Sequence, residues 1–181
     1  MKKYEFTGEM KMVNGIALKR IKRLRDGLIG GWVENEDNLS QEDGCFVYDN
    51  ALVFNNAQVF NNAQIYDNVG VFHNAKVYGN AKVYDNAAVF GHAKVYGDAQ
   101  VYKNAVVYRY SELNEDMEAS KRTKNILGFT YNITISDNHI RIGCEVKPKK
   151  AWLKVTKKQA IEMGLPKEDY KQYMLLIQAL Q

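Results

Sequence analysis

The sequence predicts an all-β protein whose chain winds into a parallel β-helix. Residues 45–110 read as consecutive hexapeptides, with no insertion between the first and the last. Each hexapeptide is a small residue, a variable residue, a branched aliphatic, an aromatic and two turn residues, as in residues 81–86. A six-residue period maintained over this length is typical of a parallel β-helix, in which each repeat adds one side of a coil.

The alternation within each hexapeptide predicts which side chains are buried. Side chains along a strand point to opposite faces in turn, so we expect Ala81 and Val83 to point inward and Lys82 and Tyr84 outward. The Asn, Asp and Gly residues that follow tolerate a positive φ and favour a tight corner. One hexapeptide cannot bury its inner face alone, so successive coils must stack.

The pattern resembles the hexapeptide-repeat family of left-handed parallel β-helices. The segment Val77-Tyr78-Gly79-Asn80-Ala81-Lys82 matches the family motif, except that an aromatic stands where the family often has Gly. The resemblance implies a left hand and three hexapeptides in each triangular coil, so that residues eighteen apart stack. The segment Ile29-Gly30-Gly31-Trp32-Val33 is closer to the family form and is expected to begin an earlier, imperfect coil.

Stacking at eighteen residues divides the outward positions among three faces. The first face carries Phe46, Tyr48, Gln64, Tyr66, Lys82, Tyr84, Gln100 and Tyr102. The second face carries Leu52, Phe54, Gly70, Phe72, Ala88, Phe90, Val106 and Tyr108. The third face carries Gln58, Phe60, Lys76, Tyr78, Lys94 and Tyr96. At one corner we expect a ladder of amide hydrogen bonds through Asn50, Asn68, Asn86 and Asn104.

The second face is apolar or Gly at every outward position, unlike the other two. A continuous apolar surface usually marks a contact surface. We therefore expect a homo-oligomer, with a trimer favoured, whose subunits meet at Leu52, Phe54, Phe72, Phe90, Val106 and Tyr108. The alternative is that the chain's own C-terminal helices cover this face.

Residues 1–44 depart from the repeat and are expected to form an N-terminal β cap and an irregular first coil. Tyr4 to Phe6 and Met10 to Val13 predict short strands, and Asn14-Gly15 predicts a hairpin turn. The basic segment 16–25 allows a strand or a helix, and the turn before it favours a strand. A cap is required because the end of a β-helix exposes unpaired strand edges.

Residues 111–143 are expected to form a loop and a β-hairpin. The polar segment Ser111 to Asp116 predicts a loop or a short helix that leaves the last coil. Strands are expected from Ile126 to Ile135 and from His139 to Ile142, joined by a turn at residues 136–138.

Residues 144–181 are expected to form a basic linker and a short helical tail. Thr156 is the expected N-cap of a helix from Lys157 to Met163. A last helix is expected from Pro166 to Leu180, and its apolar stripe consists of Tyr170, Tyr173, Met174 and Ile177.

Composition excludes few classes of function. The 181 residues are 46% hydrophobic and 25% charged, and the net charge of +4 permits an anionic ligand without requiring nucleic acid. Cys45 and Cys144 have no paired metal spacing and indicate a reduced, cytoplasmic protein. The N-terminus has no apolar leader and no later segment could span a membrane. We expect no cofactor and no membrane partner.

The chain also resembles the short hexapeptide-repeat proteins of bacteriophage and prophage genomes. The shared features are Gly30-Gly31-Trp32-Val33 before Asn38-Leu39-Ser40, the aromatic repeats, and residues 140–145 followed by Trp152. This resemblance implies a phage or prophage protein that acts in the host cytoplasm. It implies no particular biochemical activity.

Catalysis would depend on the histidines. Similar hexapeptide acyltransferases use a His as general base at a subunit interface, and His73 and His92 share the corner between the second and third faces. A related class of carbonic anhydrase holds zinc with three His, but His139 lies outside the repeats. No loop interrupts the coils to cover an acyl donor, so we do not expect an enzyme. The repeats supply only two His, so we do not expect a metal site.

Binding is the expected function, and the outward Lys and Tyr residues are its candidates. Aromatic rings interleaved with ammonium groups can stack a base and neutralise a phosphate. The candidate ligand-binding residues are His73, Lys76, Tyr78, Lys82, Tyr84, His92, Lys94 and Tyr96. We expect a non-catalytic protein that sequesters a small anionic, nucleotide-like ligand or blocks a host protein as a counter-defence factor. An acyltransferase-like enzyme and a purely structural scaffold are the alternatives.

Overall fold

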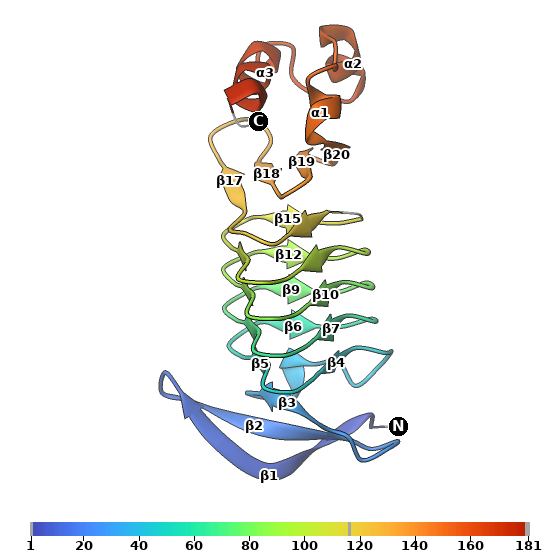
Figure 1. The fold of residues 1–181 in the computed structure, drawn as a ribbon, viewed down its shortest axis with the longest axis vertical. Coiled ribbons are helices and arrows are strands. Elements are labelled where there is room, and N and C mark those ends of the chain that lie inside the picture. The colour runs from blue at the N-terminus through green and yellow to red at the C-terminus, as the bar shows by residue number, and fades with distance from the viewer. Residues whose placement is uncertain (1, 116, 180–181) are drawn as a thin grey trace.

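Stacked coils form the body of the elongated molecule in Figure 1, a computed structural model that describes residues 2–115 and 117–179. A β-hairpin closes the N-terminal end of the coils, and a sheet with helices closes the other end. The predicted parallel β-helix is confirmed, because strands of successive coils pair in parallel throughout the hexapeptide region.

The strands of the coils form three sheets that correspond to the three predicted faces. The first face contains β4 (Phe46–Val47), β7 (Gln64–Ile65), β10 (Lys82–Val83), β13 (Gln100–Val101) and β16 (Glu118–Ala119). The second contains β5 (Leu52–Val53), β8 (Gly70–Val71), β11 (Ala88–Val89) and β14 (Val106–Val107). The third contains β6 (Gln58–Val59), β9 (Lys76–Val77), β12 (Lys94–Val95) and β15 (Glu112–Leu113). Lys82 pairs with Gln64 and Gln100, which confirms the eighteen-residue coil.

The core of the coils is built from the positions that the alternation predicts to face inward. Ala81 and Val83 are both fully buried, while Lys82 is exposed and Tyr84 is partly buried. The corners use the turn residues as expected, with Asp67 and Asp85 at φ 55 and 61. Asn68 donates to Asn86 across one corner, over 3.3 Å, which confirms one rung of the predicted ladder.

A column of aspartates, which the sequence analysis did not anticipate, also links the coils. The Asp49, Asp67 and Asp85 carboxylates each accept a hydrogen bond from the backbone N–H of the residue eighteen positions later, over 2.8–3.2 Å. These bonds satisfy corner N–H groups that the short strands leave unpaired.

The N-terminal region forms a cap and an early coil. β1 (Tyr4–Val13) is one strand with a bulge between Phe6 and Met10, where two short strands were predicted. The turn at Asn14-Gly15 leads into β2 (Ile16–Arg23), so the strand assignment for this segment is confirmed. β3 (Ile29–Val33) pairs in parallel with β5, as expected for an earlier coil, and is followed by the 3-10 helix η1 (Glu36–Asn38).

Gly30 and Gly31 allow β3 to approach the first repeats closely. A Cβ atom at Gly30 would lie 2.6 Å from the Val47 carbonyl oxygen, and one at Gly31 would lie 2.6 Å from that of Ala51. Such distances are too short for any side chain, so both positions require Gly.

The prediction that the repeat ends at Tyr110 is wrong. The segment Ser111 to Asp116, expected to form a loop or a short helix, instead contains β15, and the coils continue through β16; Asp116 itself lies outside the described residues. The physical reason is that the inward positions keep small or apolar side chains although the outward ones turn acidic: Ser111, Leu113, Met117 and Ala119 are all fully buried.

The C-terminal region is a compact module with its own core. Its antiparallel sheet consists of β17 (Lys124–Ile126), β18 (Ile133–Ile135), β19 (His139–Ile142) and β20 (Glu145–Pro148). Its helices are α1 (Lys149–Trp152), α2 (Lys157–Glu162) and α3 (Tyr170–Ala179). The predicted hairpin is present, but residues 127–132 interrupt the expected continuous strand, and part of the expected linker forms β20.

The helices of this module pack on its sheet and not on the second face. Thr156 caps α2 through a capping box with Gln159, as predicted. Tyr173 and Ile177 of α3 are buried against the sheet's own apolar side chains; the expected helix end at Leu180 lies outside the described residues. The alternative in which C-terminal helices cover the second face is therefore wrong. Within the described part of the chain, no helix is long and apolar enough to cross a membrane.

Candidate functional site

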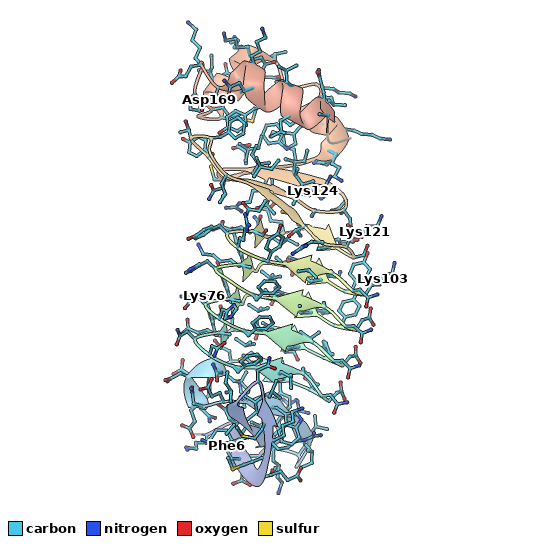
Figure 2. The ribbon with its side chains drawn as sticks, turned by 90° about the vertical axis from the view of Figure 1, so that its left-hand side faces the viewer. Phe6, Lys76, Lys103, Lys121, Lys124 and Asp169 are labelled. Carbon is cyan, nitrogen blue, oxygen red and sulfur yellow. The ribbon has the colours of Figure 1, made fainter. Side chains whose placement is uncertain are left out.

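A hollow lies where the third face of the coils meets the C-terminal module. Its volume is about 630 Å³. It is lined by Asn74, Lys76, His92, Lys94, Tyr110, Glu112, Thr130, Tyr131, Asn132, Thr134, Arg141 and Gly143. We call it the anion pocket, because three cationic side chains and one carboxylate line it. Figure 2 shows Lys76 pointing outward from the coils below the module.

The periodic strands place two lysines and the glutamate of the anion pocket in a column. Lys76, Lys94 and Glu112 occupy the same outward position in successive coils, with Lys94 paired in register to both of the others. Neighbouring strands are about 4.8 Å apart, so side chains in this column lie within contact distance. Lys76 forms no ion pair with any described residue, which leaves its ammonium group available to a ligand.

Glu112 is the centre of the charge network. Its carboxylate lies 2.9 Å from the Lys94 Nζ and 2.8 Å from the Arg141 Nη2. The hydrogen bond to Glu112 raises the pKa of the Lys94 ammonium above its ordinary value, so Lys94 remains charged at physiological pH. The Lys, Arg and Glu side chains of the lining therefore carry a net charge of +2, from three cations and one carboxylate.

Arg141 is held rigidly at the junction between β19 and the coils. Its Nη1 donates to the Tyr96 hydroxyl and to the Asn114 Oδ1, both over 2.8 Å, and its side chain is only 13% exposed. The sequence analysis missed Arg141 as a site residue. Its position in the sequence could have indicated it. Arg141 stands between Ile140 and Ile142, which are both buried, so alternation along the strand directs its charged side chain to the opposite face.

Aromatic rings complete the anion pocket. The rings of His92 and Tyr110 stack with centroids 5.0 Å apart and an interplanar angle of 6°, and Tyr110 is 50% exposed. Tyr131 comes from the loop at residues 127–132, where its backbone N–H donates to the Tyr173 hydroxyl over 3.0 Å. The pocket thus combines flat rings with ammonium and guanidinium groups.

The predicted ligand-binding residues are only partly brought together. Lys76, His92 and Lys94 line the anion pocket, whereas Lys82 and Tyr84 lie on the neighbouring first face. In each of these hexapeptides the Tyr follows the Lys by two residues, so the Lys lies near one corner of the coil and the Tyr near the next corner. Tyr78 and Tyr96 stack with each other, 4.9 Å apart, and Tyr96 reaches the pocket through its bond to Arg141.

A sequence-family model described as the YdcK beta solenoid repeat matches residues 63–79. The chain is similar to a β-solenoid repeat. The matched segment contains β7, β8 and β9, so it spans one strand of each face. The similarity supports the fold of the coils and carries no activity. A search of the curated proteins found no match to this chain.

The two corner histidines belong to different surfaces. His92 lines the anion pocket, while His73 lines a second hollow on the other side of the corner. His73 has a φ of 59, and its ring lies edge-on to Phe72 at 5.0 Å. Among the described residues, no three His, Cys, Asp or Glu side chains are grouped so that they could hold a metal ion.

The outward aromatics of the second face stack along the molecule. The ring centroids are 5.2 Å apart for Phe54 and Phe72, 4.9 Å for Phe72 and Phe90, and 6.0 Å for Phe90 and Tyr108. The chain itself covers both ends of this stack. Phe54 is buried with Leu18 and Trp32 below, and Arg122 lies 4.5 Å over the Tyr108 ring above.

The middle of the second face is less covered. Leu52, Phe72, Phe90, Val106 and Tyr108 all retain partial exposure, unlike Phe54. Leu52 and Phe72 line the hollow beside the hairpin and Arg122 lies over Tyr108, so Phe90 and Val106 are the predicted interface residues that remain for a second subunit to bury.

Proposed function

We propose that the protein is a non-catalytic binding protein that sequesters a small anionic ligand with a flat ring, of nucleotide type, in the anion pocket. The single observation that carries this proposal is the grouping of Lys76, Lys94 and Arg141 beside the exposed Tyr110 ring in one hollow. A volume of about 630 Å³ lies within the range of about 300–1,000 Å³ that is typical of small-molecule sites.

Glu112 acts as an internal substitute for the ligand's anionic group. An arriving phosphate first meets Lys76, which has no ion-pair partner among the described residues, and then competes with Glu112 for Lys94 and Arg141. Because ion pairs of this exposure contribute only about 0.2–1 kcal/mol each, exchange of the carboxylate for a phosphate requires little energy. The pocket therefore favours ligands of at least two negative charges over monoanions.

The flat rings give the pocket its second means of recognition. Stacking of a base on an aromatic side chain contributes about 1–3 kcal/mol. Tyr110 and His92 already stack with each other, and the Tyr110 ring is 50% exposed, so a ligand ring can extend this stack. A simple phosphate would use only the cations, so a ligand that carries both groups should bind more tightly.

The cellular setting that we propose is the cytoplasm of a bacterial host that carries a phage or prophage. The resemblance of residues 30–40, the aromatic repeats and residues 140–152 to short phage proteins supports this setting. Sequestration of a nucleotide-like signal would then act as a counter-defence. We also propose that the protein is a homo-oligomer, with a trimer favoured, that assembles through the part of the second face around Phe90 and Val106, which is partly exposed.

The experiment is calorimetric titration of the protein with mononucleotides, cyclic mononucleotides and cyclic dinucleotides. We expect at least one of these to bind with 1:1 stoichiometry per chain. Lys76→Ala with Lys94→Ala should abolish binding and lower the melting temperature only slightly, because the Lys94–Glu112 ion pair is lost. Lys82→Ala is the matched control, because Lys82 occupies the same position of the repeat on another face and does not line the pocket. Unchanged affinity in the double variant would remove this site from consideration.

A further inference from the structure

We propose a second binding site, for a small, flat, uncharged molecule, in a hollow between the β1–β2 hairpin and the second face. The hollow has a volume of about 680 Å³. Leu52, Phe54 and Phe72 from β5, β8 and their corners form one side, and Val13 and Ile16 from the hairpin form the other. We call it the hairpin hollow.

The hairpin hollow exists because one residue of the repeat lacks a side chain. Gly70 pairs in register with Leu52 of the preceding coil and Ala88 of the next, so it occupies an outward strand position. A Cβ atom placed on Gly70 would lie 3.5 Å from the Phe72 ring, which is an ordinary van der Waals contact. The backbone at this point therefore permits larger residues, and Gly leaves open the space that they would fill.

The chemistry of the lining selects an uncharged, flat ligand. The Phe54 and Phe72 rings stack on each other, with centroids 5.2 Å apart and an interplanar angle of 11°, and both line the hollow, so an aromatic ligand can pack edge-to-face against them. The rim consists of amides and one imidazole, from Asn14, Asn55, Asn56, His73 and Asn74. No Asp, Glu, Lys or Arg is found among the described residues that line the hollow, so nothing there would neutralise a charged ligand.

The rim amides can orient one polar end of such a ligand. Asn56 Nδ2 donates to Asn74 Oδ1 over 3.2 Å, so the Asn56 carbonyl oxygen and an Asn74 N–H remain to accept and donate. A flat aromatic molecule with a hydrogen-bonding group at one edge would contact both the Phe54 and Phe72 rings and the rim amides. Sites for small molecules typically combine such an apolar lining with a few placed polar groups.

The hairpin makes a small molecule a better occupant than a second subunit. Val13, Asn14 and Ile16 of the hairpin line one side of the hollow, so an occupant must fit between the hairpin and the sheet, which favours a small molecule. The subunit contact proposed above uses Phe90 and Val106, neither of which lines the hollow. The two proposals therefore use different parts of the second face.

The test is fluorescence titration with N-phenyl-1-naphthylamine, a neutral aromatic probe whose emission rises in apolar sites. We expect saturable binding to the wild-type protein, and at least about tenfold weaker binding to Gly70→Leu, because the added side chain fills the hollow. Ala88→Leu is the matched control: it occupies the same position one coil further on, outside the hollow, and should bind the probe as the wild type does.

A second variant keeps the test decisive if Gly70→Leu does not fold. Ile16→Trp fills the hollow from the hairpin side and should cause the same loss. The proposal is overturned if the wild type shows no saturable binding, or if both filled variants keep wild-type affinity. It is also overturned if light scattering shows an oligomeric wild type and a monomeric Gly70→Leu, because the occupant would then be a second copy of the chain.

Discussion

Glu112→Gln should change stability and ligand affinity in opposite directions, which is the sharpest test of the anion pocket. The Glu112 carboxylate contacts Lys94 at 2.9 Å and Arg141 at 2.8 Å, and no other carboxylate lines the pocket among the described residues. Gln keeps the shape of Glu and removes its charge. The net charge of the lining therefore rises from +2 to +3.

The expected magnitudes follow from the exposure of the two ion pairs. The side chains are 46% exposed for Lys94, 28% for Glu112 and 13% for Arg141. Pairs near the surface contribute about 0.2–1 kcal/mol each, so the variant should lose about 1 kcal/mol of unfolding free energy. A bound dianion no longer competes with the carboxylate, and a gain of about 1 kcal/mol in binding corresponds to about fivefold tighter binding.

Urea unfolding followed by circular dichroism measures the first quantity, and calorimetric titration with the nucleotide panel measures the second. The affinity gain should shrink as salt is raised, because ions screen exposed charges. Glu118→Gln is the matched control, since Glu118 occupies the same outward strand position on the next strand along the chain, on the first face, and does not line the pocket. A variant that is less stable and binds no more tightly than the wild type would show that Glu112 has only a structural role.

Three further predictions concern the core, the second face and the cap. Val83 is fully buried, so Val83→Asp should cost several kcal/mol of unfolding free energy through an unpaired buried charge. Lys82→Asp, at an exposed position of the same strand, should cost under about 1 kcal/mol. Equal urea midpoints for the two variants would refute the assignment of inward and outward positions. Phe90→Asp should leave the protein folded and convert an oligomer to a monomer in light scattering, and an unchanged mass would remove this interface. The hydrogen bond from Arg23 lowers the pKa of Asp26 from 3.8 to about 2. The Arg23–Asp26 contact therefore stabilises the fold above pH 3.8, and this stabilisation is lost as the pH falls through 2. The difference in urea midpoint between the wild type and Asp26→Asn should disappear over that range, and a difference that stays constant would contradict the proposed role of Asp26.

The sequence alone was sufficient to predict the coils, because their stabilising contacts recur at a fixed separation. Positions equivalent to Ala81 and Val83 recur every eighteen residues and carry small and branched aliphatic side chains. Each of these side chains is buried against the same residue types in the coils above and below. The hairpin at Asn14-Gly15 and the cap at Thr156 were predictable for a similar reason, since each depends on neighbours within a few residues.

The predicted end of the coils at Tyr110 was wrong because it relied on the outward residues, whereas the inward residues decide whether a coil forms. The outward residues at the end of the repeat, such as Glu112 and Glu118, are acidic and suggested a loop. The inward residues Leu113 and Ala119 still satisfy the packing of the core, and burial of the inward positions is what maintains the coil. A prediction based on inward positions alone would have extended the coils to Ala119.

Only the tertiary structure decided where the anion pocket lies. Lys76 and Lys94 were identifiable from the repeat, but Arg141 joins them because the C-terminal module docks on the last coil. Thr134 Oγ1 accepts a hydrogen bond from the Glu112 N–H over 3.1 Å, and the Asp137 N–H donates to the Glu118 carbonyl over 2.9 Å. Such docking depends on single hydrogen bonds between segments that do not repeat, so no periodicity in the sequence reveals it. The coils are predictable because every hexapeptide contains the same pattern of inward and outward residues.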